Sequence, residues 1–403
     1  MAIFNFLTGG DPRDRFAQQV TKRLRKHGWR LGIAYDRARF ALVLDGDAGT
    51  MYLANVFKDW LAYPRNERDA ALDLLVRPAF EVKDGQSFED VAPHLLPAIR
   101  HRAHVEVLNL HPDWTPDDVS GRQAMSEFCP PLAVLLAVDR PSSMAFVTEG
   151  SMTRWEKSFD DLLAVALENL RSRTAGEFER TPEGFFLSRY NDYYDASRLL
   201  LPHVFEALPL KGKPVAVVLS RTCVAVTGSE DNAALIELAR FVEEAWKDET
   251  RPVALAPLIL SEGEWRPFEP KEPALAEVLE LSVKQRLWDY SGQTQPLQDH
   301  QERLGRDVFV SPLENVYDEG RIQTWTSWAE GLPTLAPLAD VIALKSASGG
   351  SLARRWDDFV AIFGSLPPEP DLYPTRYRLT RWPSKELWAR LEACEPVPWF
   401  TDG

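Results

Sequence analysis

The sequence is built from short apolar segments that follow one another without a fixed repeat. Leu132 to Val138 has the length and apolar character of a buried strand. Arg13 to His27 instead spaces Phe16, Val20 and Leu24 four residues apart, as on one face of an amphipathic helix. Helical and strand patterns alternate along the chain, but no strand–helix unit recurs. We therefore predict an α+β fold with mixed, antiparallel-rich sheets and packed helices rather than a doubly wound sheet.

Prolines and charges mark a boundary near residue 271. Pro267, Pro270 and Pro273 alternate with acidic residues, and proline removes backbone donors while charge favours solvent. Seven of the 13 tryptophans follow this boundary, either as a small Trp-rich core or as an exposed recognition groove. We predict an N-terminal α+β subdomain over 1–124, an α+β core over 125–270 and a Trp-rich α+β module over 271–403.

Charge and composition argue against several classes of partner. The 403 residues include 46 Lys and Arg against 60 Asp and Glu, a net charge of -14, which opposes the attraction to phosphate that nucleic-acid binding needs. No apolar run approaches the roughly 18 residues of a membrane-spanning helix. The three cysteines are widely spaced and fit a reducing compartment. We predict a cytoplasmic protein with no nucleic-acid or membrane partner.

Four of the seven histidines lie close together in the sequence, and His94, His101 and His104 suggest a metal site. If the helix that Ser87 and Asp90 begin continued through His104, these three imidazoles would lie on one face, and Glu106 could add a carboxylate. However, the helical pattern carries Leu95, Leu96 and Ile99, and the apolar residues from Val105 to Leu110 indicate a strand. The alternative is that these histidines lie on the surface or in the core.

A second candidate is the segment around Tyr193. Its charged and tyrosine side chains could form a recognition loop in which arginines bind a carboxylate or phosphate while tyrosines contact the partner. The alternative, which we favour, is that the aspartates cap a helix and the aromatic rings pack inward. The candidate binding residues are Arg189, Asp192, Tyr193, Tyr194, Asp195 and Arg198.

Residues from about 15 to 270 resemble the YtpQ-like bacterial family, domain of unknown function 1444. The similarity rests on Met51 to Asn55, on the stretch from Trp155 to Leu170 and above all on Asn191 to Leu199. The resemblance implies a bacterial protein but conveys no activity. The segment 271–403 lies outside it.

Chemical motifs give little support for catalysis. The sequence has no G-x-S-x-G nucleophile elbow, no H-E-x-x-H zinc helix and no paired C-x-x-C. We predict no cofactor, and we lean towards a non-catalytic module that binds another protein. The alternative is a metal-dependent hydrolase that uses His94, His101 and His104.

Overall fold

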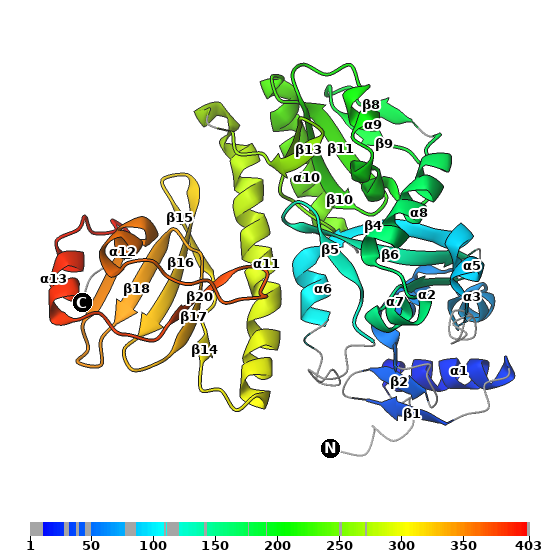
Figure 1. Cartoon of the computed structure of the whole chain (residues 1–403), viewed down its shortest axis with the longest axis horizontal. Helices are drawn as coiled ribbons and strands as arrows, with labels where there is room; N and C mark the ends of the chain where they lie inside the picture. Colours follow the sequence, from blue (N-terminus) through cyan, green and yellow to red (C-terminus); the bar gives the residue numbers. More distant parts are fainter. Residues whose placement is uncertain are drawn as a thin grey trace, which may run out of the picture. The chain divides into compact units, whose positions relative to one another are not determined.

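The computed structural model describes residues 11–27, 32–37, 40–44, 50–76, 86–108, 110, 121–140, 143–175, 177–190, 192–249, 252–270 and 272–400. The chain divides into two compact units, which are considered one at a time: Met1–Leu96 with Ala137–Phe146, and Pro97–Leu136 with Val147–Gly403 (Figure 1). Helices and mostly antiparallel strands are both abundant in the described residues, which confirms the α+β class. The division into 1–124, 125–270 and 271–403 stays a prediction.

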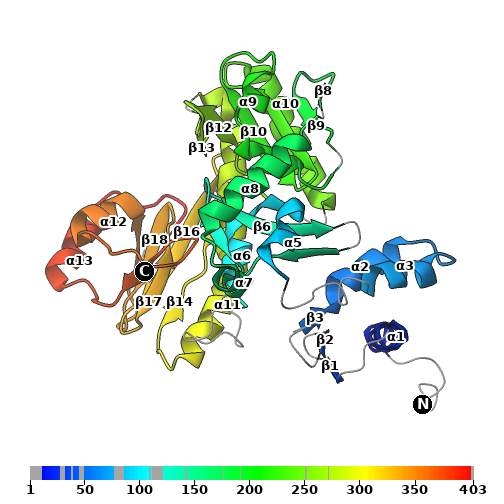
Figure 2. The ribbon, with the colours of Figure 1, turned by 45° about the vertical axis from the view of Figure 1, so that its right-hand side comes forward.

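The first unit packs helices against a small antiparallel sheet (Figure 2). The sheet contains β1 (Ile33–Asp36), β2 (Ala41–Leu44) and β3 (Thr50–Tyr52), and the helices are α1 (Pro12–Lys26), α2 (Leu53–Ala62), α3 (Arg68–Val76), α5 (Phe88–Val91) and η1 (Ala92–His94). Strand β7 (Ser143–Phe146) pairs with residues 137–140 of β6 (Leu132–Arg140). The predicted apolar face of α1 is buried, since Phe16, Val20 and Leu24 lie in one core with Leu42 and Leu53.

A six-stranded antiparallel sheet organises the first half of the second unit. Its strand order is β13 (Glu264–Pro267), β12 (Leu258–Ser261), β10 (Pro214–Ser220), β11 (Cys223–Gly228), β9 (Phe186–Ser188) and β8 (Phe178–Arg180). Because successive side chains of a strand point to opposite faces, Val215 and Val217 join the core under α10 (Asn232–Asp248), whereas Ala216 and Val218 join the core on the other face. Helices on that other face include α8 (Phe159–Ser172), η2 (Asp195–Leu200) and α9 (His203–Glu206).

Further elements lie between residues 95 and 155. They are β4 (Leu95–His101), α6 (Arg102–Leu108), β5 (Met125–Glu127) and α7 (Glu149–Trp155). Strand β5 pairs with residues 133–135 of β6. The buried first half of β6 agrees with the strand predicted at Leu132 to Val138.

The C-terminal part forms two small sheets and two helices. One sheet has the order β15 (Glu314–Asp318), β16 (Arg321–Ala329), β18 (Val341–Lys345), β19 (Ser351–Arg355), and the other has β14 (Phe309–Val310), β17 (Thr334–Pro337), β20 (Arg376–Leu379). The helices are α12 (Trp356–Phe363) and α13 (Lys385–Glu392). Trp328 and Trp356 are buried together with Phe359, so these two tryptophan rings belong to a core rather than to an exposed groove.

The long helix α11 (Ala276–Arg303) follows η3 (Pro273–Leu275) and connects these parts of the second unit (Figure 1). It packs against α10 and α6, and also against β14 and β16. Leu275 of η3 and Val278 and Leu281 in the first turns of α11 complete the core under α10, where all three are buried. Of the helices in the described residues, none combines the length and apolar character needed to cross a bilayer.

Residues 88–108 differ from the prediction in the order of their elements. The capping box of Ser87 and Asp90 is present, but the helix it begins ends at Val91. The segment predicted as helical is instead strand β4, and the segment predicted as a strand is helix α6. Five successive residues of β4, from Leu95 to Ile99, are buried. A short, fully buried strand therefore produced an apolar run that periodicity does not distinguish from a helix.

Candidate functional site

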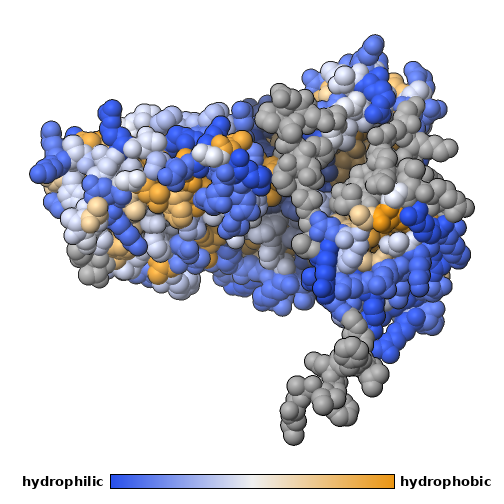
Figure 3. All heavy atoms as spheres, turned by 90° about the horizontal axis from the view of Figure 1, so that it is seen from below, coloured by the Kyte–Doolittle hydropathy of each residue, from blue (hydrophilic) through white to orange (hydrophobic). Residues whose placement is uncertain are grey.

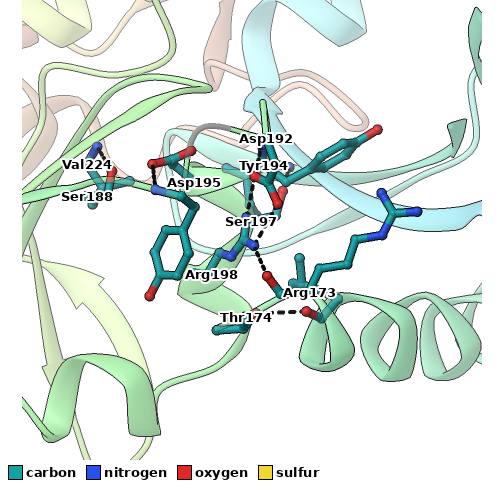
Figure 4. A network of polar contacts seen from close by, with 12 residues as sticks. Arg173, Thr174, Ser188, Asp192, Tyr194, Asp195, Ser197, Arg198 and Val224 are labelled. Carbon is teal, nitrogen blue, oxygen red and sulfur yellow. Dashed lines mark hydrogen bonds and ion pairs between the residues drawn. The ribbon is translucent and has the colours of Figure 1, made fainter. Parts of the chain in front are cut away.

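The candidate site is the loop between β9 and η2, which we call the Tyr193 loop (residues 188–198). Strand β9 is buried and pairs with β11, and its last residue, Ser188, accepts a hydrogen bond from the Val224 amide at 3.0 Å. The loop therefore leaves the sheet from a fixed point and enters η2 at Asp195 (Figure 4). Asn191 lies outside the described residues.

Arg198 holds the Tyr193 loop in place from the interior of the protein. Its guanidinium is fully buried and bonds both carboxylate oxygens of Asp192, at 2.6 and 2.7 Å (Figure 4). A third bond, at 3.0 Å, reaches the carbonyl of Arg173 at the end of α8, which satisfies one of the free acceptors of that helix terminus. The face of the Tyr190 ring lies 4.1 Å from the guanidinium carbon. A buried charge of this kind is tolerated because it is paired and hydrogen-bonded.

The two aspartates of the loop have opposite electrostatic environments. Burial opposes ionisation of Asp192, but the bonds from Arg198 outweigh it and the pKa of Asp192 falls below its usual value. Burial raises the pKa of Asp195, and bonds from Ser188 and the Tyr190 amide only partly offset this effect. One oxygen of Asp195, Oδ1, has no hydrogen-bond partner among the described residues. Asp192 therefore holds a charge at neutral pH at low cost, whereas Asp195 holds one at a penalty.

The two adjacent tyrosines point to different environments. Tyr194 is 2% exposed, and its amide donates to Asp192 Oδ1 at 3.0 Å, a local bond typical of tight turns. Tyr193 is 61% exposed and adopts a left-handed backbone with φ of 66°, a conformation rare for a bulky residue. Its ring lies 4.8 Å from the guanidinium carbon of Arg221. The loop thus presents one aromatic ring beside one cation.

Sequence reasoning assigned six residues to this site, and the structure gives them distinct positions. Asp192 pairs with Arg198, whereas Asp195 accepts a bond from the Tyr190 amide; Arg198 is turned inward and engaged, so it does not present its charge at the surface. Arg189 lies at the surface and pairs with Glu179 at 2.7 Å. Arg221 was not assigned to the site, since it is 28 positions from Tyr193 and no local pattern connects the two.

The histidines and Glu106 are placed in separate surroundings. His94 ends η1 in the first unit, whereas His101 ends β4 and His104 is exposed on α6 in the second. His101 is buried; its Nε2 lies 2.5 Å from Asp289 Oδ1, and its ring stacks on Trp288 at 4.0 Å between ring centres.

Glu106 has other partners. It accepts bonds from the Arg102 side chain and from the Tyr373 amide, at 2.7 and 2.8 Å. No group of three His, Cys, Asp or Glu side chains within the described part of the chain could hold a metal ion. The predicted metal ligands are therefore not brought together, because the helix expected to align them is a strand followed by a helix.

Asp289 and Gln285, which sequence reasoning missed, complete the surroundings of His101. The Gln285 amide donates to Asp289 Oδ1 at 2.6 Å, and its oxygen accepts from the Leu255 amide at 2.6 Å. These partners come from α11, almost 190 residues beyond His101. No local sequence signal could have identified them.

Two cysteines lie in environments that disfavour the thiolate. Burial raises the pKa of the Cys129 and Cys223 thiols to about 11. Because the thiolate is the nucleophilic form, neither side chain is suited to nucleophilic catalysis at neutral pH.

Comparisons with known proteins give one similarity. The chain is 24% identical over 159 residues to a UPF0354 protein of Listeria monocytogenes, an alignment that covers 38% of this chain and 60% of the relative. The name of that protein states no activity or ligand. No family model matches, and no solved structure gives a significant match. The similarity is to a family without a defined function, and it leaves the YtpQ-like assignment a prediction.

Proposed function

We propose that the chain is a non-catalytic, cytoplasmic binding protein that recognises another protein through Tyr193 and its neighbour Arg221. The observation that carries the proposal is an exposed aromatic ring held in a left-handed backbone conformation above a buried ion pair. Strained backbone of this kind persists only where the surrounding structure enforces it, and it concentrates at functional sites.

The residue types suit protein recognition. Tyrosine and arginine are enriched among the residues that dominate binding energy at interfaces. Tyrosine also supplies a large contact area with few rotatable bonds, so fixing it in a complex costs little entropy. Here the cost is lower still, because the Arg198–Asp192 pair already fixes the backbone on which Tyr193 stands.

The chemistry of the pair limits the partner. Arg221 brings a positive charge against the face of Tyr193, so the complementary surface offers a carboxylate next to an apolar or aromatic group. We therefore expect an acidic patch on the partner protein.

Site-specific photo-crosslinking in the host tests the proposal. Tyr193 is replaced by p-benzoylphenylalanine and the cells are irradiated; we expect one discrete adduct with a second polypeptide. The matched control places the same residue at Tyr317, a tyrosine on β15 that is 69% exposed. We expect no discrete adduct from this position.

A second variant shows whether the adduct depends on the proposed recognition pair. Arg221→Ala in the chain carrying the photo-residue at 193 should reduce the adduct at least about tenfold, since it removes the charge expected to bind the partner's carboxylate. Equal adducts from 193 and 317, or an adduct indifferent to Arg221→Ala, would contradict the proposal. Circular dichroism checks that each variant is folded.

A further inference from the structure

The first unit contains a cationic pocket between α1 and the region that joins α2 to α3. Its volume is about 690 Å³, within the range of sites for small ligands. Three basic residues of α1, Lys22, Arg23 and Lys26, line one side, and Arg65 and Arg68 line the other. Among its lining residues the carboxylate of Asp69 is the counter-charge, so positive charge dominates. We call this cavity the α1 pocket.

The charge of the α1 pocket contrasts with the acidity of the chain. Residues 1–96 carry 14 Lys and Arg against 13 Asp and Glu, whereas residues 97–403 carry 32 Lys and Arg against 47 Asp and Glu, a net charge of -15. The surface around α1 to α3 is predominantly hydrophilic (Figure 3). Five cations around one cavity are therefore a local concentration and not the average character of the protein.

Part of the wall of the α1 pocket is fixed by protein contacts. Arg23, whose side chain is 11% exposed, pairs with Asp69 and with Asp73, which ties α1 to α3. Arg68 donates to the carbonyls of Tyr63 and Leu61, at 3.0 and 2.7 Å, and lies 4.9 Å from the ring centre of Trp60. These contacts hold both guanidinium groups in place without a ligand, and the charge of Arg68 is not paired with a carboxylate in them, whereas that of Arg23 is.

Three other cations have no such partner. Within the described residues, the side chains of Lys22, Lys26 and Arg65 form no hydrogen bond or ion pair, although the charge of Lys26 is close enough to Asp73 to interact with it. Lys22 and Lys26 are one helical turn apart, about 6 Å between their Cβ atoms, and Arg65 approaches the cavity from a different element. The pocket thus combines a fixed cationic wall with three cations that are available to a ligand.

We propose that the α1 pocket binds a small molecule that carries two or more linked phosphate groups. Several cations converging from two sides match an anion with multiple charges better than a single carboxylate, and lysine and arginine are the usual protein ligands of phosphate. A short ligand fits better than a nucleic-acid chain, because a long polyanion would meet the net negative charge of the rest of the protein.

Isothermal titration calorimetry on the full chain with inorganic tripolyphosphate as the probe tests this site. We expect saturable binding at low ionic strength that weakens as salt is added. Orthophosphate and citrate should bind at least about tenfold more weakly, since one lacks the linked phosphates and the other offers carboxylates.

Paired variants separate the pocket from general charge. Lys22→Gln with Lys26→Gln should weaken tripolyphosphate binding at least about tenfold. The control, Arg15→Gln with Lys58→Gln, removes the same charge from exposed positions outside the pocket and should change affinity by less than about twofold. Thermal unfolding followed by circular dichroism checks that both variants are folded.

Three results would overturn the proposal. The first is absence of tripolyphosphate binding to the unaltered protein at millimolar concentration. The second is an equal loss in both double variants, which would indicate non-specific charge attraction. The third is single-stranded oligonucleotide binding that exceeds tripolyphosphate binding and strengthens with length, which would assign the pocket to nucleic acid instead.

Discussion

Arg198 and Arg376 are both completely buried in the second unit, and they bond different kinds of partner; the Nε of Arg198 has no hydrogen-bond partner among the described residues. Arg198 is paired with the carboxylate of Asp192, six residues away in sequence. Arg376 bonds the side-chain oxygens of Gln293 and Thr294 and two backbone carbonyls, at 2.6 to 3.1 Å. Burial lowers the pKa of Arg376 to about 10, so it still carries its charge at neutral pH.

Arg198 makes contacts within one local region of the sequence, whereas Arg376 makes contacts between segments that are distant in sequence. The acceptors of Arg376 lie on α11, after β14 and on β17, so one side chain joins segments that are 41 to 83 residues distant in sequence. The Arg198 pair instead sets the shape of a single loop and the position of Tyr193. Loss of Arg376 should therefore destabilise the unit most, and loss of the Arg198 pair should destabilise it less while also releasing the loop that carries Tyr193.

The largest effect is expected from Arg376→Met. The methionine would leave several buried acceptors without a donor, at a cost of about 4 kcal/mol in the free energy of unfolding. Urea denaturation measures this change. As a control, Arg378→Gln on the same strand removes a half-buried pair with Glu369 and should cost about 1 kcal/mol or less in the free energy of unfolding. Similar losses for both variants would show that the bonds of Arg376 to distant segments do not make it especially important for stability.

Asp192→Asn should have the next largest effect. It leaves the guanidinium of Arg198 buried without its counter-charge, which should lower the free energy of unfolding by about 3 kcal/mol at pH 7. Because the pKa of Asp192 is lowered in the folded protein, its contribution is complete above the unfolded pKa, about 4, and is lost as pH falls through the folded pKa.

The difference between the unaltered protein and Asp192→Asn should therefore shrink on acidification below about pH 4. Arg189→Gln breaks the exposed pair with Glu179 and serves as control, with an expected change of less than about 1 kcal/mol. A pH-independent loss in Asp192→Asn would show that the pairing is not electrostatic.

A smaller effect of opposite sign is expected from Asp195→Asn. Burial raises the pKa of Asp195, so the ionised carboxylate destabilises the fold at neutral pH and the neutral amide should raise the free energy of unfolding by about 1 kcal/mol. The gain should disappear as pH falls through the raised pKa, because the native aspartate is then protonated as well. Urea titrations at pH 7 and pH 4 test this, and destabilisation at pH 7 would contradict it.

The smallest effect on stability is expected from Tyr193→Gly. Glycine adopts φ of 66° without the penalty of a side chain, which offsets the lost contact with Arg221 and the added freedom of the unfolded chain. The net change should lie within about 0.5 kcal/mol. A loss of 2 kcal/mol or more would place the Tyr193 ring in the core and argue against a recognition role.

Local signals in the sequence predicted local features well. Ser87 with Asp90 forms the expected capping box, because such a pair depends only on residues three positions apart. The apolar spacing of α1 likewise gave its buried face. The predicted order of a helix followed by a strand was wrong for the segments that form β4 and α6. The successive buried residues of β4 show no alternation of apolar and polar side chains that would indicate a strand.

The environment of the site could not be predicted in the same way. Asp192, Asp195 and Arg198 were recognised as candidates, but whether Arg198 faces a ligand or the interior depends on the end of α8 and on Tyr190, which close around it only in the fold. The sequence did not predict a structural role for Arg376, because its hydrogen-bond acceptors are neutral and distant in sequence. Burial, rather than residue type, decides the role of both arginines.

The start of α11 limits where recombination can join a new C-terminal segment to this chain. Leu275 just before α11 and Val278 and Leu281 within it complete the core between α10 and the six-stranded sheet. A gene truncated at codon 270 would encode a product with an exposed apolar face, and such a product should aggregate. Recombination that joins new C-terminal segments to this protein should therefore spare the start of α11, and crossover points should fall within or beyond its later turns.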